Sequence, residues 1–77
     1  MNNKKREKLR GVIKQISYVE RVLSDVLDDE QECLDNMPEN LESSTTYCKI
    51  DDACDNLESA VDSIREADSY VREAMLK

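Results

Sequence analysis

The 77-residue chain contains no histidine, no tryptophan and no phenylalanine, and it has only one glycine and one proline. The lack of histidine excludes Ser-His and Cys-His nucleophile pairs and most catalytic zinc sites. One glycine cannot form the common phosphate-binding loops, which need at least two. One glycine and one proline are also too few for the many tight turns of an all-β chain. What remains is a helix-rich protein, and we expect it to be non-enzymatic and to hold no cofactor.

Long apolar runs are also lacking. The short run Gly11-Val12-Ile13 follows a basic N-terminus but is interrupted at once by Lys14, so a secretory signal is not expected. No stretch approaches the roughly 18 apolar residues of a membrane span. The three cysteines are odd in number and form no C-x-x-C pair, which indicates reduced thiols. We therefore expect a cytoplasmic protein without a membrane partner.

Charge is abundant and unevenly placed. The formal net charge is -7, from 11 basic and 18 acidic residues. Residues 1–14 hold six basic residues and one acidic residue, whereas residues 15–77 hold five basic and 17 acidic residues. The overall acidity disfavours direct binding to nucleic acid. The asymmetry predicts a rod with a positive end and a strongly negative remainder.

Apolar residues recur at alternating spacings of three and four, which is the pattern of a seam between packed helices. In the first half of the chain this seam runs through Leu9, Val12, Ile16, Val19, Leu23, Val26, Glu30 and Cys33. In the second half it runs through Tyr47, Ile50, Cys54, Leu57, Val61, Ile64, Asp68, Val71 and Met75. Two such runs predict two long helices packed along their lengths.

A turn separates the two runs. Pro38 disfavours helical geometry at Met37, so the first helix should end near residue 35 or 36. Ser43 or Ser44 is the natural N-cap of the second helix. We predict helix over about 3–35, a turn over about 36–43, and helix over about 44–76. The fold class is all-α, an antiparallel, coiled-coil-like hairpin.

The two seams also predict a register. Centring the turn on Asn40 places Val19 against Val61 and Leu23 against Leu57. In the same register Cys33 faces Tyr47.

A two-helix hairpin of this length can bury only a small core, and the chain has more apolar surface than one seam needs. Further apolar residues flank the seam on the first helix, and alanines recur every seven residues on the second: Ile13, Val22, Leu27, Leu34, Ala53, Ala60, Ala67 and Ala74. We expect a homodimer that forms a four-helix bundle. The alternative is a monomeric hairpin with some exposed aliphatic side chains.

Several acidic residues of the second helix lie off the seam, namely Asp51, Asp52, Asp55, Glu58, Asp62 and Glu66. Paired carboxylates can hold magnesium for hydrolysis, but positions off the seam favour solvated charge, and we expect no metal. Glu30 and Asp68 lie within the seam, where a polar residue commonly fixes register. We expect Asp68 to lie within reach of Arg10 or Arg65.

The basic N-terminus is the least ordinary feature of the chain. Its candidate binding residues are the basic side chains of the first turns and two tyrosines beside them: Lys4, Lys5, Lys8, Arg10, Lys14, Tyr18 and Tyr70. Positive charge at a helix N-terminus is unfavourable by about 0.3–1 kcal/mol per site. Three interpretations stay open: contact with the acidic turn of a second copy, an anionic ligand or partner at this end, or a frayed tail.

One resemblance rests on the turn. The run Asp35-Asn36-Met37-Pro38-Glu39-Asn40-Leu41, together with residues 54–67, resembles a family of short phage and prophage proteins. Those proteins have a basic N-terminal helix, an N-M-P-E-N-L turn and an acidic second helix. The turn motif is fairly specific, whereas the second helix has generic coiled-coil composition. The resemblance implies an accessory phage protein in a bacterial cytoplasm, and it assigns no catalytic or binding residues.

Three functions follow as hypotheses. The first is an interaction module that binds a host or phage protein, with an acidic surface imitating nucleic acid to counter host defence. The second is a sponge that sequesters a nucleotide-like anion at the basic, tyrosine-bearing end. A metal-dependent helical pyrophosphatase is the third and least favoured.

Overall fold

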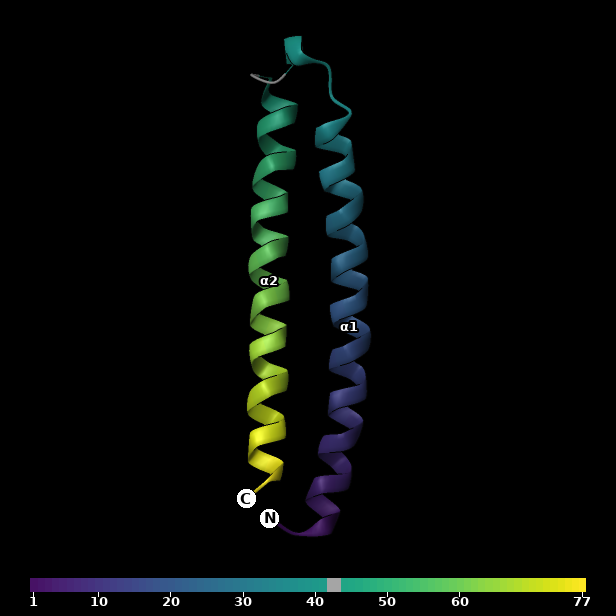
Figure 1. Cartoon of the computed structure of the whole chain (residues 1–77), viewed down its shortest axis with the longest axis vertical. Coiled ribbons are helices and arrows are strands. Elements are labelled where there is room, and N and C mark those ends of the chain that lie inside the picture. The colour runs from purple at the N-terminus through teal and green to yellow at the C-terminus, as the bar shows by residue number, and fades with distance from the viewer. Residues whose placement is uncertain (42–43) are drawn as a thin grey trace.

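A computed structural model describes residues 1–41 and 44–77 and shows two long helices lying side by side (Figure 1). Helix α1 spans Asn3–Asp35, the short 3-10 helix η1 spans Glu39–Leu41, and helix α2 spans Thr45–Met75. The molecule is a rod of 59 × 15 × 13 Å, with both termini at one end and the turn at the other. The all-α, antiparallel hairpin expected from the two heptad runs is confirmed, and each helix begins and ends within one residue of its expected bounds.

Side chains cap the start of both helices. The Asn2 side chain accepts a hydrogen bond from the Lys5 backbone N–H at 2.9 Å, and the Ser44 hydroxyl accepts one from the Tyr47 backbone N–H at 3.1 Å. Each bond satisfies one of the N–H groups that a helix N-terminus leaves without a partner. Ser44 is therefore the N-cap of α2, while the other candidate, Ser43, lies outside the described residues.

The predicted seam of α2 is confirmed by burial. Every seam residue from Tyr47 to Met75 is half-buried or buried. Of the described residues only Cys54 and Val61 are buried, with 4% and 5% of their surfaces exposed. A pair of helices shields only a narrow strip on each, so the hairpin has a seam rather than an enclosed core.

The predicted seam of α1 is wrong at every second position. Leu9, Ile16, Leu23 and Glu30 are half-buried as expected, but Val12, Val19, Val26 and Cys33 are exposed. Their places are taken by the residues one position later, the half-buried Ile13, Glu20, Leu27 and Leu34. Three residues assigned to oligomer contacts, Ile13, Leu27 and Leu34, therefore belong to the hairpin's own seam.

The charged residue Glu20 occupies one position of this seam, where it is paired with Arg65. Its side chain is 31% exposed and accepts a hydrogen bond from Arg65 Nε at 2.7 Å. A long acidic side chain can cover apolar surface with its methylene groups while its carboxylate reaches water or a partner. The seam therefore tolerates Glu20 and leaves the smaller Val19 on the outside.

The register also differs from the prediction, by about one helical turn. Leu27 lines the same pocket as Glu58 and Val61, and Glu20 pairs with Arg65. The predicted register instead placed Val61 against Val19, which is 41% exposed. The displacement follows from the seam of α1, because packing Ile13, Glu20 and Leu27 inward shifts the partners that each can reach on α2.

The two sides of the seam have different chemistry. One side, which we call the polar flank, carries the residues that follow seam residues by one position in the chain, such as Arg10, Ser24 and Arg72. The hydrogen bond from Gln31 to Glu58 also lies on this side. Residues that precede seam positions by one lie on the opposite side in both antiparallel helices. That side, which we call the valine–alanine face, carries polar residues such as Lys8, Gln15, Asp29 and Ser63, and it is named for its apolar residues: Val12, Val19, Val22, Val26, Cys33, Ala53, Ala60, Ala67 and Ala74.

Candidate functional site

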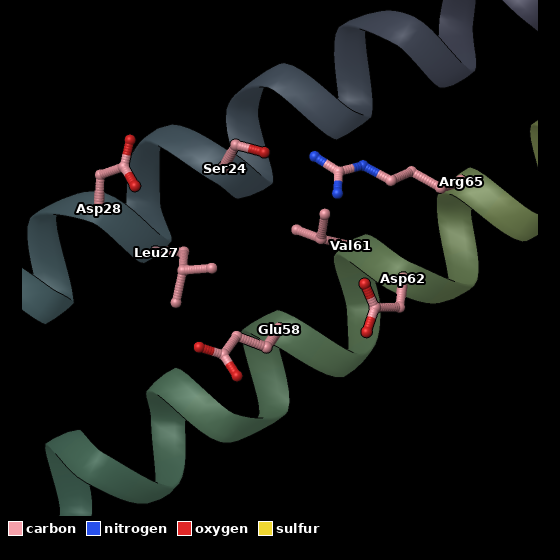
Figure 2. A pocket seen from close by; sticks show the side chains of 7 residues that line it. All are labelled: Ser24, Leu27, Asp28, Glu58, Val61, Asp62 and Arg65. Carbon is pink, nitrogen blue, oxygen red and sulfur yellow. The ribbon is translucent and has the colours of Figure 1, made fainter.

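A groove on the polar flank brings carboxylates from both helices over an apolar floor (Figure 2). Its volume is about 340 Å³, and we call it the acidic groove, lined by Ser24, Leu27, Asp28, Glu58, Val61, Asp62 and Arg65. Leu27 and Val61 are seam residues and form the floor, because the seam is where the two helices meet. Asp28, Glu58 and Asp62 are exposed and stand on the rim.

The spacing of acidic residues on α2 builds one wall of this groove. Asp51, Asp55, Glu58 and Asp62 succeed one another at intervals of four, three and four, which places them in one row along the helix. The Gln31 side-chain amide donates to Glu58 Oε1 at 3.1 Å and so ties this row to α1. The row is an extended acidic edge rather than an isolated group of charges.

Arg65 closes the groove at its positive end. Its side chain extends from α2 toward α1 (Figure 2) and donates to Glu20 at 2.7 Å. This hydrogen bond, together with the charges of Glu20 and Asp62, raises the pKa of Arg65 above its ordinary value. Since Arg65 is bonded to Glu20, the salt bridges within the described residues leave Asp28, Glu58 and Asp62 without a cationic partner.

The expectation that the chain binds no metal stays a prediction. Within residues 1–41 and 44–77, no three carboxylate or thiol side chains are grouped closely enough to hold a metal ion. The acidic residues of α2 that were expected off the seam are all exposed. Exposed carboxylates in a row along a helix can attract a cationic side chain of a partner.

A second pocket lies at the open end of the hairpin, and it is basic. It has a volume of about 400 Å³ and is lined by Arg10, Ile13, Lys14, Arg72, Met75 and Leu76. The Arg10 and Lys14 side chains come from α1, and Arg72 comes from α2. Arg72 was not among the predicted site residues, because the predicted register did not bring it to Arg10.

The other predicted residues of the basic end lie elsewhere. Lys4, Lys5 and Lys8 are exposed on the first turns and do not line the pocket. Tyr18 is 60% exposed and stacks under the Arg21 guanidinium, 5.8 Å from ring centroid to Cζ. The Tyr70 hydroxyl donates to Glu66 at 3.2 Å. The structure therefore unites Arg10 and Lys14 but separates them from the tyrosines.

The N-terminus is held against the end of α2. The Arg6 Nε donates to the backbone carbonyl of Met75 at 3.0 Å, and the N-terminal ammonium donates to the Lys77 carbonyl at 3.2 Å. Positive groups beside the carbonyl end of α2 are favourable, because the C-terminus of a helix is the negative end of its dipole. These contacts offset the unfavourable position of the same charges at the start of α1.

Asp68, a carboxylate in the seam of α2, has a hydrogen-bond partner for only one of its two oxygens. Asp68 pairs with Arg72 at 2.8 Å rather than with the expected Arg10 or Arg65, and its second oxygen, Oδ1, is buried without a hydrogen-bond partner.

Cys54 is the buried thiol of the chain, whereas Cys33 and Cys48 are exposed. Burial, followed by the charges of Glu30 and nearby carboxylates of α2, raises the pKa of the Cys54 thiol.

Comparison with known proteins gives no relative: no protein-family model, no curated protein and no solved structure matches this chain. Within the described residues, neither helix combines the length and the apolar composition that crossing a lipid bilayer requires.

Proposed function

We propose that the protein is a non-enzymatic helical interaction module whose acidic groove receives lysine or arginine side chains from a basic surface on another protein. The observation that carries this proposal is the pairing of an apolar floor, Leu27 and Val61, with a rim of carboxylates that have no described ion-pair partner. The long stem of a lysine or arginine covers apolar surface while its charged end stays polar. Such a side chain matches both parts of the groove.

The distribution of charge along the rod supports the same function. Residues 25–62, which we call the turn half, contain 13 acidic residues and one basic residue, a net charge of -12. The remaining residues, the open half, contain 10 basic and five acidic residues, a net charge of +5. A negative field of this size steers basic surfaces toward the turn half and repels nucleic acid.

A basic protein groove that ordinarily binds nucleic acid is the partner surface that suits this half best. The exposed row of carboxylates on α2 could occupy such a groove in place of phosphates, which is a means of blocking a host defence protein. The resemblance of residues 35–41 to short phage proteins supports a phage-type accessory role in a bacterial cytoplasm. The partner is accordingly a host or phage protein.

The test is capture of a partner from a bacterial lysate by the tagged chain, followed by quantitative mass spectrometry. The triple variant Asp28→Asn, Glu58→Gln and Asp62→Asn removes three charges from the groove. Its matched control, Glu7→Gln, Glu66→Gln and Glu73→Gln, removes the same charge from the open half. Loss of one basic protein from the first variant but not the second supports the proposal, and equal retention by both would overturn it.

The basic pocket favours a second candidate function, sequestration of a nucleotide-like anion. Arg10, Lys14 and Arg72 would contact phosphate groups, while Ile13, Met75 and Leu76 offer apolar surface to a base or sugar. Neither exposed tyrosine contributes, so stacking on an aromatic ring is not part of this candidate. Arg72 would have to share its charge between the ligand and Asp68.

This candidate is tested by thermal unfolding with linear and cyclic nucleotides at millimolar concentration. Binding to the folded state raises the midpoint temperature in proportion to ligand concentration and affinity. Lys14→Glu should abolish the rise, whereas Lys4→Glu, an equal charge change at an exposed residue outside the pocket, should leave it intact. An unchanged midpoint in the wild-type chain with every nucleotide excludes this function.

We also propose that the protein acts as a homodimer, two hairpins forming a four-helix bundle. The support is that only two side chains are buried in the described chain, while Val12, Val19, Val22 and Val26 stay 37–45% exposed. A hairpin of this size stabilises itself weakly, and covering a second apolar face adds stability in proportion to the area removed from water. Light scattering at micromolar concentration tests the mass.

A further inference from the structure

We infer that the second copy packs on the valine–alanine face with the two hairpins antiparallel, so that each basic open half lies along the acidic turn half of the other. The two-fold axis crosses the face near Val22 and Ser63. This inference rests on the proposed homodimer and adds its surface, its orientation and its centre.

The valine–alanine face is the apolar side of the hairpin. Four β-branched valines project from α1. On α2 an alanine recurs every seven residues, and these small side chains allow another helix to approach closely. The opposite, polar flank carries the neutral polar residues Ser24 and Gln31 and charged residues such as Arg10, Glu58 and Arg72. A second copy on the polar flank would bury those charges, whereas next to the seam on the valine–alanine face it buries valine and alanine side chains.

The two apolar rows share a centre, which a two-fold axis requires. On α1 the row from Val12 to Cys33 is centred close to Val22, and on α2 the row from Ala53 to Ala74 is centred close to Ser63. Val22 and Ser63 lie at nearly the same height on the rod, between the contacts of Glu20 with Arg65 and of Leu27 with Val61. One axis therefore passes through the centre of both rows.

Charge selects the orientation. If both turns lay at the same end of the dimer, two turn halves of net charge -12 would lie side by side, as would two open halves of +5. The antiparallel arrangement instead sets each +5 half beside a -12 half. Neighbouring helices are about 10 Å apart, close to the Debye length of about 8 Å at physiological salt, so these interactions are only partly screened.

The antiparallel arrangement has a defined helix pairing. A two-fold axis across the rod lays α1 along α1 of the second copy and α2 along α2, so valines meet valines and alanines meet alanines. A two-fold axis along the rod would instead lay α1 along α2 of the second copy. Both arrangements leave the acidic groove and the basic pocket uncovered, because both features lie on the polar flank.

Cysteine cross-linking distinguishes the arrangements. In a Cys33→Ser, Cys48→Ser background, which retains the buried Cys54, single cysteines are introduced by Val22→Cys, Ser63→Cys or Ser24→Cys and treated with a short bismaleimide. Near the axis a residue meets its own copy, so Val22→Cys and Ser63→Cys should each give a covalent dimer. Ser24→Cys, a half-buried position on the polar flank two residues from Val22, is the matched control and should give none. Light scattering of each untreated variant reports its mass.

Each other outcome overturns a different step. If a mixture of the Val22→Cys and Ser63→Cys chains cross-links while neither does so alone, the two-fold axis runs along the rod and the orientation is wrong. If Ser24→Cys cross-links instead, the second copy packs on the polar flank and the assigned face is wrong. If every variant and the wild-type chain are monomeric by light scattering, the homodimer itself fails, and the inference fails with it.

Discussion

At the scale of single residues, the seam contains a carboxylate that is only half satisfied. Asp68 Oδ2 accepts a hydrogen bond from Arg72 Nε at 2.8 Å, while Oδ1 is buried without a partner. A buried polar atom without a hydrogen bond typically lowers stability by about 1–3 kcal/mol, whereas an exposed ion pair adds less than about 1 kcal/mol. The seam at Asp68 is thus a local weakness that an apolar side chain would remove.

We therefore expect Asp68→Leu to raise the free energy of unfolding by about 1–2 kcal/mol, since it removes the unsatisfied oxygen and adds apolar burial. Urea titration followed by circular dichroism measures the change. Asp55→Leu, which alters an exposed residue of the same helix, is the control and should change stability much less. A decrease in stability for Asp68→Leu would show that its pairing with Arg72 outweighs the burial term.

Cys54 gives the hairpin a dependence on alkaline pH. Burial raises the pKa of its thiol, so the unfolded chain loses this proton at a lower pH than the folded chain does. The stabilisation is fully present below the unfolded value of about 8.5 and is lost as pH rises from there toward the folded pKa. Cys54→Val should flatten the decline in the free energy of unfolding between pH 8 and 9.5. Leu57→Val, which alters the same seam without removing a titratable group, should leave the decline unchanged, and an equal effect of both variants would contradict the assignment.

At the scale of helices, the start of α2 depends on one hydroxyl. The Ser44 hydroxyl accepts a hydrogen bond at 3.1 Å from the backbone N–H of Tyr47, the first seam residue of α2. We expect Ser44→Ala to lower the free energy of unfolding by about 1 kcal/mol, the usual effect of losing an N-cap. Ser59→Ala, in the exposed middle of the helix, should be neutral or slightly stabilising because alanine is the better helix former. Urea titration of both variants makes the comparison.

The helices and their turn could be predicted because the signals are local: heptad spacing, Pro38 and a capping serine. The seam of α1 could not, because two heptad patterns one residue apart share Leu9, Ile16 and Leu23. The pattern through Val12, Val19 and Val26 is wholly apolar there, whereas the true one contains Glu20. Only the three-dimensional contact with Arg65 shows why Glu20 is tolerated.

The error in the seam carried over to the register and the sites. Arg10 and Lys14 were identified from their charge, but Arg72 joins them only in the observed register. Likewise the acidic residues of α2 were identified, but the groove needs Leu27 and Val61 opposite each other, which the predicted register did not give. The charged residues could thus be identified from the local sequence. Which of them lie next to one another depends on the register of the two helices.

At the scale of the whole molecule, substitutions of two lysines near the open end test the valine–alanine face and the polar flank independently. Lys8 precedes Val12 by one helical turn and so shares the valine–alanine face, whereas Lys14 lines the basic pocket on the polar flank. Lys8→Glu and Lys14→Glu change the charge of the open half equally.

In the antiparallel dimer Lys8 lies beside the acidic turn half of the second copy. Reversing its charge therefore replaces an attraction with a repulsion at two symmetric places. At about 0.5–1 kcal/mol for each place, we expect Lys8→Glu to weaken the dimer about tenfold and Lys14→Glu to weaken it much less. Sedimentation equilibrium at 0.1 M salt measures both dissociation constants. Equal weakening by the two variants would mean that only net charge matters, and that neither flank is the specific interface.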